Sequence, residues 1–287
     1  MARVSRIPSL AVLAVLGGVL LAGCGTPKKT ASAPVKATAA ACSPAKLATK
    51  HKGVLTVATD SPAYPPYFEH NSPKNGEGLE SAVAYAVAHK LGYARDKVKW
   101  VVEPFDSSYA PGPKSFDFDI NEISITPARA KVVTFSVPYY TNPQGILVRA
   151  GSALAHATSL AAFKHAKLGV QIGTTSLAAA QAGIKPSQQP DVFNTSNDVV
   201  SAFKIKRVDA IVVDLATAFT LTSELKGSTI AGQFSAAGGD HWGLLMQKGA
   251  PIASCVNRAV GALRANGTLT ALSRRWIASA AKVPVLH

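Results

Sequence analysis

The sequence predicts an α/β protein with two similar lobes. From residue 53 onward, short apolar strands alternate with segments of helical periodicity, and the alternation runs through two successive series. The second series repeats the order of features found in the first. Because strands that alternate with helices build mainly parallel sheets covered by helices, each series is expected to form its own sheet. Two such lobes that face each other would enclose a cleft.

The first series begins with a strand at 53–59 and a helix at 79–91. The helix ends at Gly92, a usual position for a left-handed capping residue. Strands at 98–103 and 116–120 follow. The second of these carries Asp117 and Asp119, although a buried parallel strand should be apolar on both faces. These two carboxylates therefore indicate either an edge position or a polar lining.

The nine residues 121–129 predict a binding site for an anion. Thr126 has the hydroxyl of an N-cap and Pro127 favours the first helical position, so Arg129 falls on the first helical turn. Its guanidinium and the free backbone N–H groups of the helix start suit a carboxylate. Glu122 ends the preceding strand. Arg129 could therefore bind the negative end of a zwitterion and Glu122 its positive end. The alternative is an ordinary surface pair between Arg129 and Glu122.

The second series supplies a matching pair of features. Its strands are expected at 167–172 and 208–213, and its helices at 175–182 and 196–206. Thr174 and Thr175 follow the first of these strands, and their hydroxyls suit another helix start that could hold an anion. The segment 208–214 aligns with 116–122, so Asp214 takes the place of the acidic residue in the first series. A cleft between the two copies could grip both ends of an amino acid.

Four further residues are candidates for the cleft. Asp60 and Tyr64 follow the carboxyl end of the first strand, where open α/β sheets bind ligands, although the prolines there could simply turn the chain. Glu80 lies in the first turn of a helix, where it either complements the helix dipole or meets a ligand. Phe105 follows a strand end and either stacks on a ligand or packs in the core.

The N-terminal residues predict export and anchoring. Two arginines precede an unbroken apolar run at 10–21, which is too short for a stable span and indicates a signal peptide at 1–23. The ending Leu-Ala-Gly-Cys resembles the bacterial lipobox, which implies that Cys24 becomes the lipidated first residue. The alternative is a buried free cysteine after a chance apolar run. Residues 24–52, rich in Ala, Thr, Pro, Ser and Lys, are expected to form a flexible tether.

Composition argues against several classes of function. The 287 residues carry a formal net charge of +14, and many of the positive charges are tether lysines without interleaved aromatics. An anionic bilayer explains them better than nucleic acid does. The sequence contains no GxSxG, P-loop, HExxH or zinc–cysteine pattern, so we expect no cofactor and no metal. Cys42 and Cys255 lack metal-ligand spacing, and an exported protein favours a disulfide between them.

Several motifs together carry a resemblance to a known family. They are Thr59-Asp60 with Tyr64-Pro65-Pro66, Ser124-Ile125-Thr126-Pro127-Ala128-Arg129, Ser136-Val137-Pro138-Tyr139-Tyr140, Gly173-Thr174-Thr175, Val208-Asp209-Ala210 with Asp214, and Asn266-Gly267-Thr268-Leu269 with Trp276. With them, residues 53 to 280 resemble the family 3 solute-binding proteins, the polar amino-acid receptors of ABC importers. The resemblance implies a periplasmic-binding-protein-like type II fold with two crossing hinge strands. Lobe 1 is then expected at 53–142 and 239–287, and lobe 2 at 143–238.

The resemblance also implies roles for the candidate residues. Arg129, the Ser124 backbone and Thr175, next to Thr174, would hold the ligand's α-carboxylate, and Asp214 would take its α-ammonium. Tyr64 and Phe105 would flank the ligand side chain, and Asp60 and Glu80 would border its pocket. The sequence departs from the family pattern in two places, with Glu122 where Gly or Ser is usual and Gly78-Leu79-Glu80-Ser81-Ala82-Val83 where Gly-Phe-Asp-x-Asp-Leu is usual. The acidic residues favour a cationic or amide-bearing ligand.

These expectations combine into one functional hypothesis and two alternatives. The hypothesis is a monomeric lipoprotein, anchored outside the cytoplasm through Cys24, that delivers a polar amino acid to an ABC permease and catalyses no reaction. The first alternative is a cyclohexadienyl dehydratase-like enzyme on the same fold, with Glu122 as general acid. The second is an orphan sensory lipoprotein that signals through closure of its lobes.

Overall fold

The structure, a computed structural model of the chain, describes residues 42–236, 238–277 and 283–287. The predicted signal peptide at 1–23, the lipidation site Cys24 and the tether residues 24–41 lie outside the described residues. Within the described ranges, no helix has the length and apolar character needed to span a membrane.

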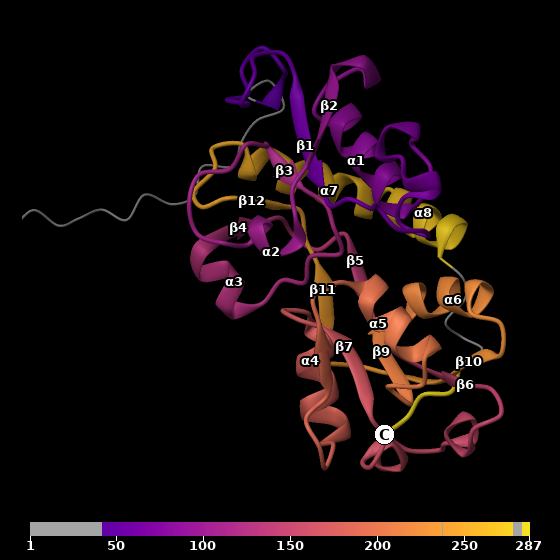
Figure 1. The fold of residues 1–287 in the computed structure, drawn as a ribbon. Helices are drawn as coiled ribbons and strands as arrows, with labels where there is room; N and C mark the ends of the chain where they lie inside the picture. Colours follow the sequence, from indigo (N-terminus) through magenta and orange to yellow (C-terminus); the bar gives the residue numbers. More distant parts are fainter. Residues whose placement is uncertain (1–41, 237, 278–282) are drawn as a thin grey trace, which may run out of the picture. The chain divides into compact units, whose positions relative to one another are not determined.

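The first sheet has five strands in the order β2-β1-β3-β12-β4. They are β1 (Leu55–Thr59), β2 (Val98–Val102), β3 (Phe118–Asp119), β4 (Val133–Phe135) and β12 (Leu245–Gln247). β1 is parallel to β2 and β3, whereas β12 is antiparallel to β3 and β4. The helices α1 (Leu79–Lys90), α7 (Ala253–Ala265) and α8 (Thr268–Trp276) pack against one another beside this sheet (Figure 1). Their apolar residues share one core with Leu55 and Val57 of β1, and Ala58 packs in a second cluster, so every residue of β1 is buried.

The second sheet has the strand order β10-β6-β9-β7-β8. Its strands are β6 (Gln144–Arg149), β7 (Leu168–Gln171), β8 (Asp191–Phe193), β9 (Ala210–Asp214) and β10 (Ser228–Phe234). The helices of this half are α4 (Thr175–Ala179), α5 (Ser196–Lys204) and α6 (Leu215–Glu224). Alternate residues of β9 enter different cores, because successive side chains of a strand point to opposite faces. Val212 joins the core that contains α4, and Ile211 joins the core of α5 and α6.

Two short antiparallel strands lie where the chain passes between the two sheets. β5 (Tyr140–Asn142) precedes β6, and β11 (Asp240–Trp242) precedes β12. The last residues depart from the prediction that 239–287 belong to the first lobe. Val285 pairs with Gln233 of β10, and Leu286 is buried in the second core. Gly232 makes room for Leu286, since a Cβ there would lie 2.4 Å from the Leu286 side chain.

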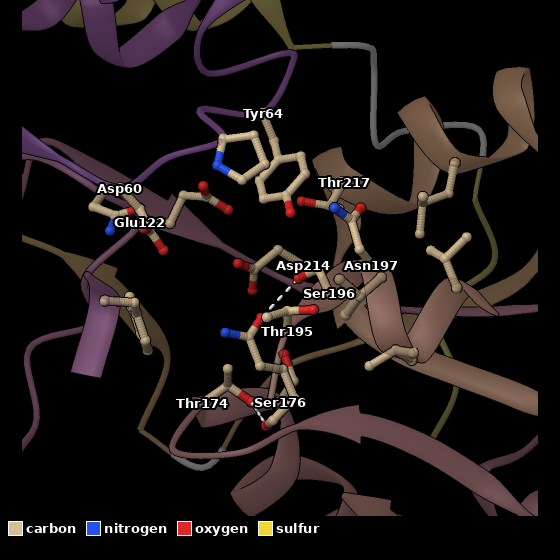
Figure 2. Close-up of a pocket in the computed structure, with 18 of the residues that line it drawn as sticks. Asp60, Tyr64, Glu122, Thr174, Ser176, Thr195, Ser196, Asn197, Asp214 and Thr217 are labelled. Atoms are coloured by element: carbon tan, nitrogen blue, oxygen red, sulfur yellow. Dashed lines mark hydrogen bonds between the residues drawn. The ribbon is translucent and has the colours of Figure 1, made fainter. Parts of the chain in front are cut away.

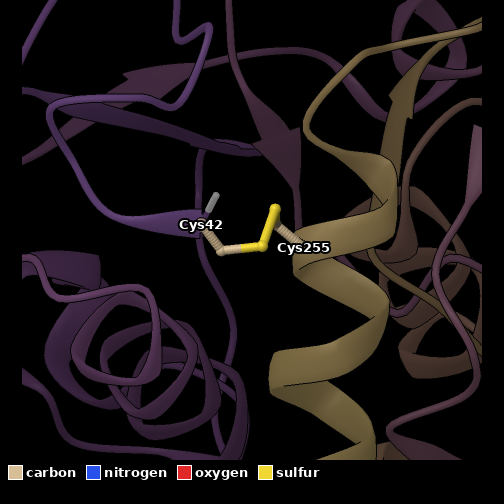
Figure 3. The surroundings of a disulfide bond; sticks show 2 residues. All are labelled: Cys42 and Cys255. Carbon is tan, nitrogen blue, oxygen red and sulfur yellow. A yellow bond between two sulfur atoms is a disulfide. The ribbon is translucent and has the colours of Figure 1, made fainter. Parts of the chain in front are cut away.

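The segment 42–52 is not a flexible tether, contrary to prediction. A disulfide joins Cys42 to Cys255 of α7, as expected, with the Cα atoms 5.5 Å apart (Figure 3). Leu47 is buried in the first core. The backbone N–H of Lys50 donates to Asp117 over 2.7 Å, so this carboxylate holds the segment to the sheet. The lysine-rich composition suggested a solvated linker, but the disulfide, the buried Leu47 and the hydrogen bond to Asp117 hold the segment against the fold.

The two carboxylates of the strand at 116–120 occupy neither of the expected positions. Asp117 accepts the backbone N–H groups of Lys50 and Thr56. Asp119 is fully buried on β3, which lies inside the sheet between β1 and β12. Burial raises the pKa of Asp119 well above its ordinary value, which favours the uncharged carboxyl at this position.

Candidate ligand-binding site

A cavity of about 500 Å³ lies between residues of the two sheets. The first half contributes the loop after β1 and the segments around Phe105 and Glu122. The second half contributes the turn after β7, the start of α5, the end of β9 and one face of α6. Ligand cavities in proteins commonly measure about 300–1,000 Å³, so this one has room for a small polar molecule. Figure 2 shows oxygen-bearing side chains around the space from several directions.

Arg129 is fixed at one end of the cavity by the start of α3 (Pro127–Val132). Thr126 caps this helix, and its hydroxyl accepts the Arg129 backbone N–H over 3.2 Å. The guanidinium donates to the carbonyl groups of Ser124 and Gly173, each over 2.9 Å. Because Arg129 is buried and bonded to these carbonyls, the alternative of a surface pair with Glu122 is wrong.

Two aromatic rings make cation–π contacts with the Arg129 guanidinium. Its central carbon lies 4.4 Å from the ring centre of Tyr109 and 5.4 Å from that of Phe105. Tyr109 in turn donates its hydroxyl proton to Asp106 over 2.6 Å. Phe105 lines the cavity and also packs edge-on against Tyr109. These contacts restrict the Arg129 side chain, which is a requirement for precise recognition of a carboxylate.

The turn between β7 and α4 faces Arg129 from the other lobe. The Thr174 hydroxyl caps α4 by accepting the backbone N–H of Leu177 over 3.3 Å. The Thr175 hydroxyl lies 3.1 Å from the Ser124 hydroxyl of the first lobe, and both residues line the cavity. Gly173 has a positive φ of 73°, and a Cβ there would lie 2.5 Å from the Tyr109 hydroxyl. Only glycine lets this turn approach the first lobe so closely.

Asp214 brings a carboxylate into the same cavity from the end of β9. One of its oxygens accepts from the amides of Asn142, over 2.6 Å, and Gln144, over 2.9 Å. Burial, and then the negative charge of Asp240, raise the pKa of Asp214 to about 8. An ammonium group beside this carboxyl would stabilise its ionised form.

Two further carboxyl groups, those of Asp60 and Glu122, face the cavity on one side of Asp214 (Figure 2). Tyr64 points into the space between them and Thr217, which lies on the other side with Asn197. Burial, followed by the charges of Glu80, Asp214 and Asp60, raises the pKa of Glu122 well above its ordinary value. So many acidic groups around one space favour a ligand that carries positive charge.

The sequence-predicted residues that line the cavity are Asp60, Tyr64, Phe105, Glu122, Ser124, Arg129, Thr174, Thr175 and Asp214. Glu80 does not line it, contrary to the prediction that it borders the ligand. It is fully buried at the start of α1, where it accepts the backbone N–H of Glu122 over 2.6 Å. The backbone of Glu122 therefore separates Glu80 from the cavity.

Sequence reasoning missed the residues that hold Asp214. Asn142 and Gln144 donate to it, and Gln144 also accepts from the hydroxyl of Ser176 over 2.5 Å. A signal was present, because Gln144 is a fully buried polar residue at the start of a strand whose next four residues, Gly145 to Val148, are apolar. Its partner is 70 residues away along the chain, and only the pairing of β6 with β9 brings the two together. In the described part of the chain, no cluster of three or more His, Cys, Asp or Glu could hold a metal ion.

The protein has two α/β lobes with a cavity between them. One lobe contributes a guanidinium to this cavity and the other a carboxylate, an arrangement that fits a two-lobe solute-binding protein. Residues 55–279 match the bacterial extracellular solute-binding proteins, family 3, and the chain belongs to this family.

Two characterised relatives have the same level of similarity. The L-cystine-binding protein TcyJ of Escherichia coli is 28% identical over 237 residues, which cover 79% of this chain and 84% of TcyJ. The L-arginine-binding protein of Pseudomonas aeruginosa is 28% identical over 228 residues, which cover 74% of this chain and 86% of that protein.

Solved structures show the same architecture. An ancestral arginine-binding protein bound to arginine superimposes with a TM-score of 0.65 at 28% identity, over 78% of this chain and 98% of that one. The ancestral amino acid-binding protein AncCDT-1, a precursor of cyclohexadienyl dehydratase, gives 0.64 at 29% identity, over 78% and 95%. The two-lobe fold expected from the sequence is thereby confirmed.

Proposed function

We propose that the protein is the substrate-binding component of an ABC transporter and that it captures a cationic amino acid in the cavity between its lobes. The observation that carries the proposal is that Arg129 and Asp214, from different lobes, line one cavity. A guanidinium and a carboxylate that face one space suit the two charged ends of an amino acid.

In the proposed complex, the ligand's α-carboxylate lies on Arg129 beside Ser124 and Thr175. Its α-ammonium lies on Asp214. The Arg129 guanidinium uses one N–H of each terminal nitrogen for carbonyl groups, so further N–H groups remain for a carboxylate. Tyr64 and Phe105 flank the ligand side chain.

The side chain of the ligand is proposed to be basic. Asp60 and Glu122 both face the cavity, and this chain has Glu122 where the family usually has a small residue. A distal ammonium or guanidinium would pair with these carboxylates and offset their mutual repulsion. The name of the Pseudomonas aeruginosa relative, an L-arginine-binding protein, agrees with this choice.

Closure of the lobes around the ligand is proposed to occur at β5 and β11. In the structure the contacts between the lobes include isolated hydrogen bonds, such as Tyr67 to Thr217 at 3.1 Å and Ser124 to Thr175 at 3.1 Å. Hydrogen bonds of this kind can break and re-form during a hinge motion. We further propose that Cys24 anchors a monomeric protein to the outer face of the cytoplasmic membrane.

Isothermal titration with the twenty amino acids tests the proposal. We expect one or more basic amino acids to bind at a single site without turnover. Arg129→Lys and Asp214→Asn should each raise the Kd by about 30-fold or more, since breaking a buried charged contact costs about 2–5 kcal/mol. Asp96→Asn, which removes an exposed carboxylate paired with Lys97, is the matched control and should leave the Kd unchanged. Failure of every amino acid to bind would refute the proposal.

An enzymatic function is the second candidate, because Glu122 offers a carboxyl of raised pKa to the cavity. Such a group can act as a general acid. The likeness to AncCDT-1, a precursor of cyclohexadienyl dehydratase, makes this worth a direct assay. Product formation from prephenate or arogenate that disappears in Glu122→Gln would establish this function. A stable complex with an unmodified amino acid, without product, would exclude it.

A further inference from the structure

Glu80 occupies an unusual place for a carboxylate. It is the second residue of α1 and is fully buried, with no exposed surface. One carboxyl oxygen accepts two hydrogen bonds, from the backbone N–H of Glu122 and from the hydroxyl of Tyr139. The other oxygen has no partner among the described residues.

The helix dipole does not account for this placement. An acidic residue in the first helical turn stabilises a helix by facing the free N–H groups of its own first turn. Glu80 instead bonds segments that lie 42 and 59 residues away along the chain. Its own backbone N–H donates to the carbonyl of Tyr67 over 3.0 Å, so the helix start is satisfied by other means.

The backbone of α1 is built to place Glu80 at this point. Gly78 has a positive φ of 94°, and a Cβ there would lie 2.3 Å from the carbonyl oxygen of Tyr67. Glycine alone allows the chain to enter the helix this close to Tyr67. This close approach fixes the start of α1, and from there the Glu80 carboxyl reaches the backbone of Glu122.

The backbone of Glu122 needs such support. Its φ is 53°, in the left-handed region, which is unfavourable for a residue that carries a side chain. The hydrogen bond from its N–H to Glu80, at 2.6 Å, stabilises this conformation. Since the direction of a side chain follows from the backbone that carries it, the same bond sets where the Glu122 carboxyl enters the cavity.

The second hydrogen bond ties this loop to a linking strand. Tyr139 is the residue directly before β5, and its ring lies 6.4 Å from that of Trp242 on β11. The Glu80 oxygen that accepts from Glu122 therefore also bonds Tyr139, which precedes β5 and packs against Trp242 of β11.

We propose that Glu80 is a positioning residue for ligand selectivity: it touches no ligand, and it holds the Glu122 carboxyl where a ligand's distal cation is met. This inference rests on the proposed function. In this proposal, Glu80 affects ligand selectivity through the position of its carboxyl oxygen and not through its negative charge.

Two conservative substitutions separate position from charge. Glu80→Gln removes the charge but keeps an acceptor oxygen at the same distance from the backbone. Glu80→Asp keeps the charge but withdraws the oxygen by one methylene. The readout is the ratio of Kd values for L-citrulline and L-arginine, which have nearly the same shape and differ in the charge of the distal group.

We expect Glu122→Gln to lower the preference for arginine over citrulline by about tenfold or more. Glu80→Asp should lower it to a similar extent, and Glu80→Gln should retain it. The double variant Glu80→Asp with Glu122→Gln should show no further loss, because both changes remove the same interaction. Thermal melts of each variant check that it is folded.

Three outcomes would overturn the inference. The first is loss of selectivity in Glu80→Gln with retention in Glu80→Asp, which would mean that Glu80 acts by charge. The second is an equal change of both Kd values in both variants, which would mean a structural role alone. The third is a wild-type protein that binds amino acids without preferring arginine to citrulline. In that case amino-acid binding stands, whereas failure to bind any amino acid defeats the proposed function itself.

Discussion

Burial and the nearby Asp240 raise the pKa of Asp214 to about 8, so we expect this carboxyl to hold a proton at neutral pH before a ligand binds. An incoming α-ammonium stabilises the ionised carboxylate and so lowers this pKa. Ligand binding below about pH 8 must therefore release a proton. The charge state of one residue thus links affinity to pH.

We predict that affinity for an amino acid weakens as the pH falls below 8, by up to about tenfold per pH unit for each carboxyl that must ionise. Titration calorimetry between pH 5.5 and 8.5, in two buffers with different ionisation enthalpies, measures both the Kd and the number of protons released. Glu122→Gln serves as the comparison, since it retains the part of the effect due to Asp214. An affinity that is constant or rises towards pH 5.5 would contradict the prediction.

Single residues show what local sequence could establish and what it could not. The N-cap Thr126 and the position of Arg129 on the first turn were predictable, because both depend on neighbours within a few residues. Glu80 was equally well placed by its helix but wrongly assigned to the cavity. Its burial depends on Tyr139 and Glu122, which contact it through tertiary structure.

At the scale of elements, the turn between β7 and α4 leaves little room for a side chain at Gly173. Gly173 combines a positive φ with a carbonyl that accepts from Arg129. We predict that Gly173→Ala weakens ligand binding by about tenfold, because the added Cβ pushes against Tyr109 and an alanine relieves its left-handed backbone, which costs about 1–2 kcal/mol, by moving the turn away from Arg129. Calorimetry measures the effect.

Two further variants make the Gly173 prediction specific. Tyr109→Phe combined with Gly173→Ala should recover part of the affinity, since it removes the hydroxyl that lies 2.5 Å from the new Cβ. Gly151→Ala is the matched control, because a Cβ there meets nothing within 4 Å. Full affinity in Gly173→Ala alone would show that the close approach of the turn is not required.

The segment 42–52 is the second element with a testable energetic role. Its disulfide closes a loop of 213 residues, and bonds of this kind commonly contribute about 2–5 kcal/mol to the free energy of unfolding. We predict a loss of this size for Cys42→Ser with Cys255→Ser, measured by denaturant unfolding. Ligand affinity should stay within about twofold, since neither cysteine lines the cavity. Unchanged stability would mean that Leu47 and Asp117 hold the segment without the bond.

At the scale of the whole molecule, buried acids make stability depend on pH. The pKa of Glu80 is raised to about 7 and that of Asp214 to about 8, against ordinary values of 4.5 and 3.8. The pKa values of Asp119 and Glu122 are also well above normal. The folded protein therefore retains protons that the unfolded chain has released between about pH 4 and pH 8, so its stability falls as the pH rises through this range.

We predict that the ligand-free protein melts at a higher temperature at pH 5.5 than at pH 8. Scanning calorimetry at the two pH values checks this. The difference should shrink in Glu122→Gln, which removes one of the acids, and also with saturating ligand, whose ammonium stabilises the ionised carboxylates. A protein that is more stable at pH 8 without ligand would show that these acids are ionised without cost.

The sequence by itself determined the alternation of strands and helices, the two capped turns that carry Arg129 and Thr175, and the acid at the end of the strand in each half. These features depend on side-chain periodicity and on contacts between near neighbours. Only the tertiary structure decided that Gln144 supports Asp214, that Glu80 lies behind Glu122, that 42–52 is fixed and that Leu286 returns to the second core. Each of these joins residues far apart in the chain, and their partners are set by strand pairing and burial, which local sequence does not specify.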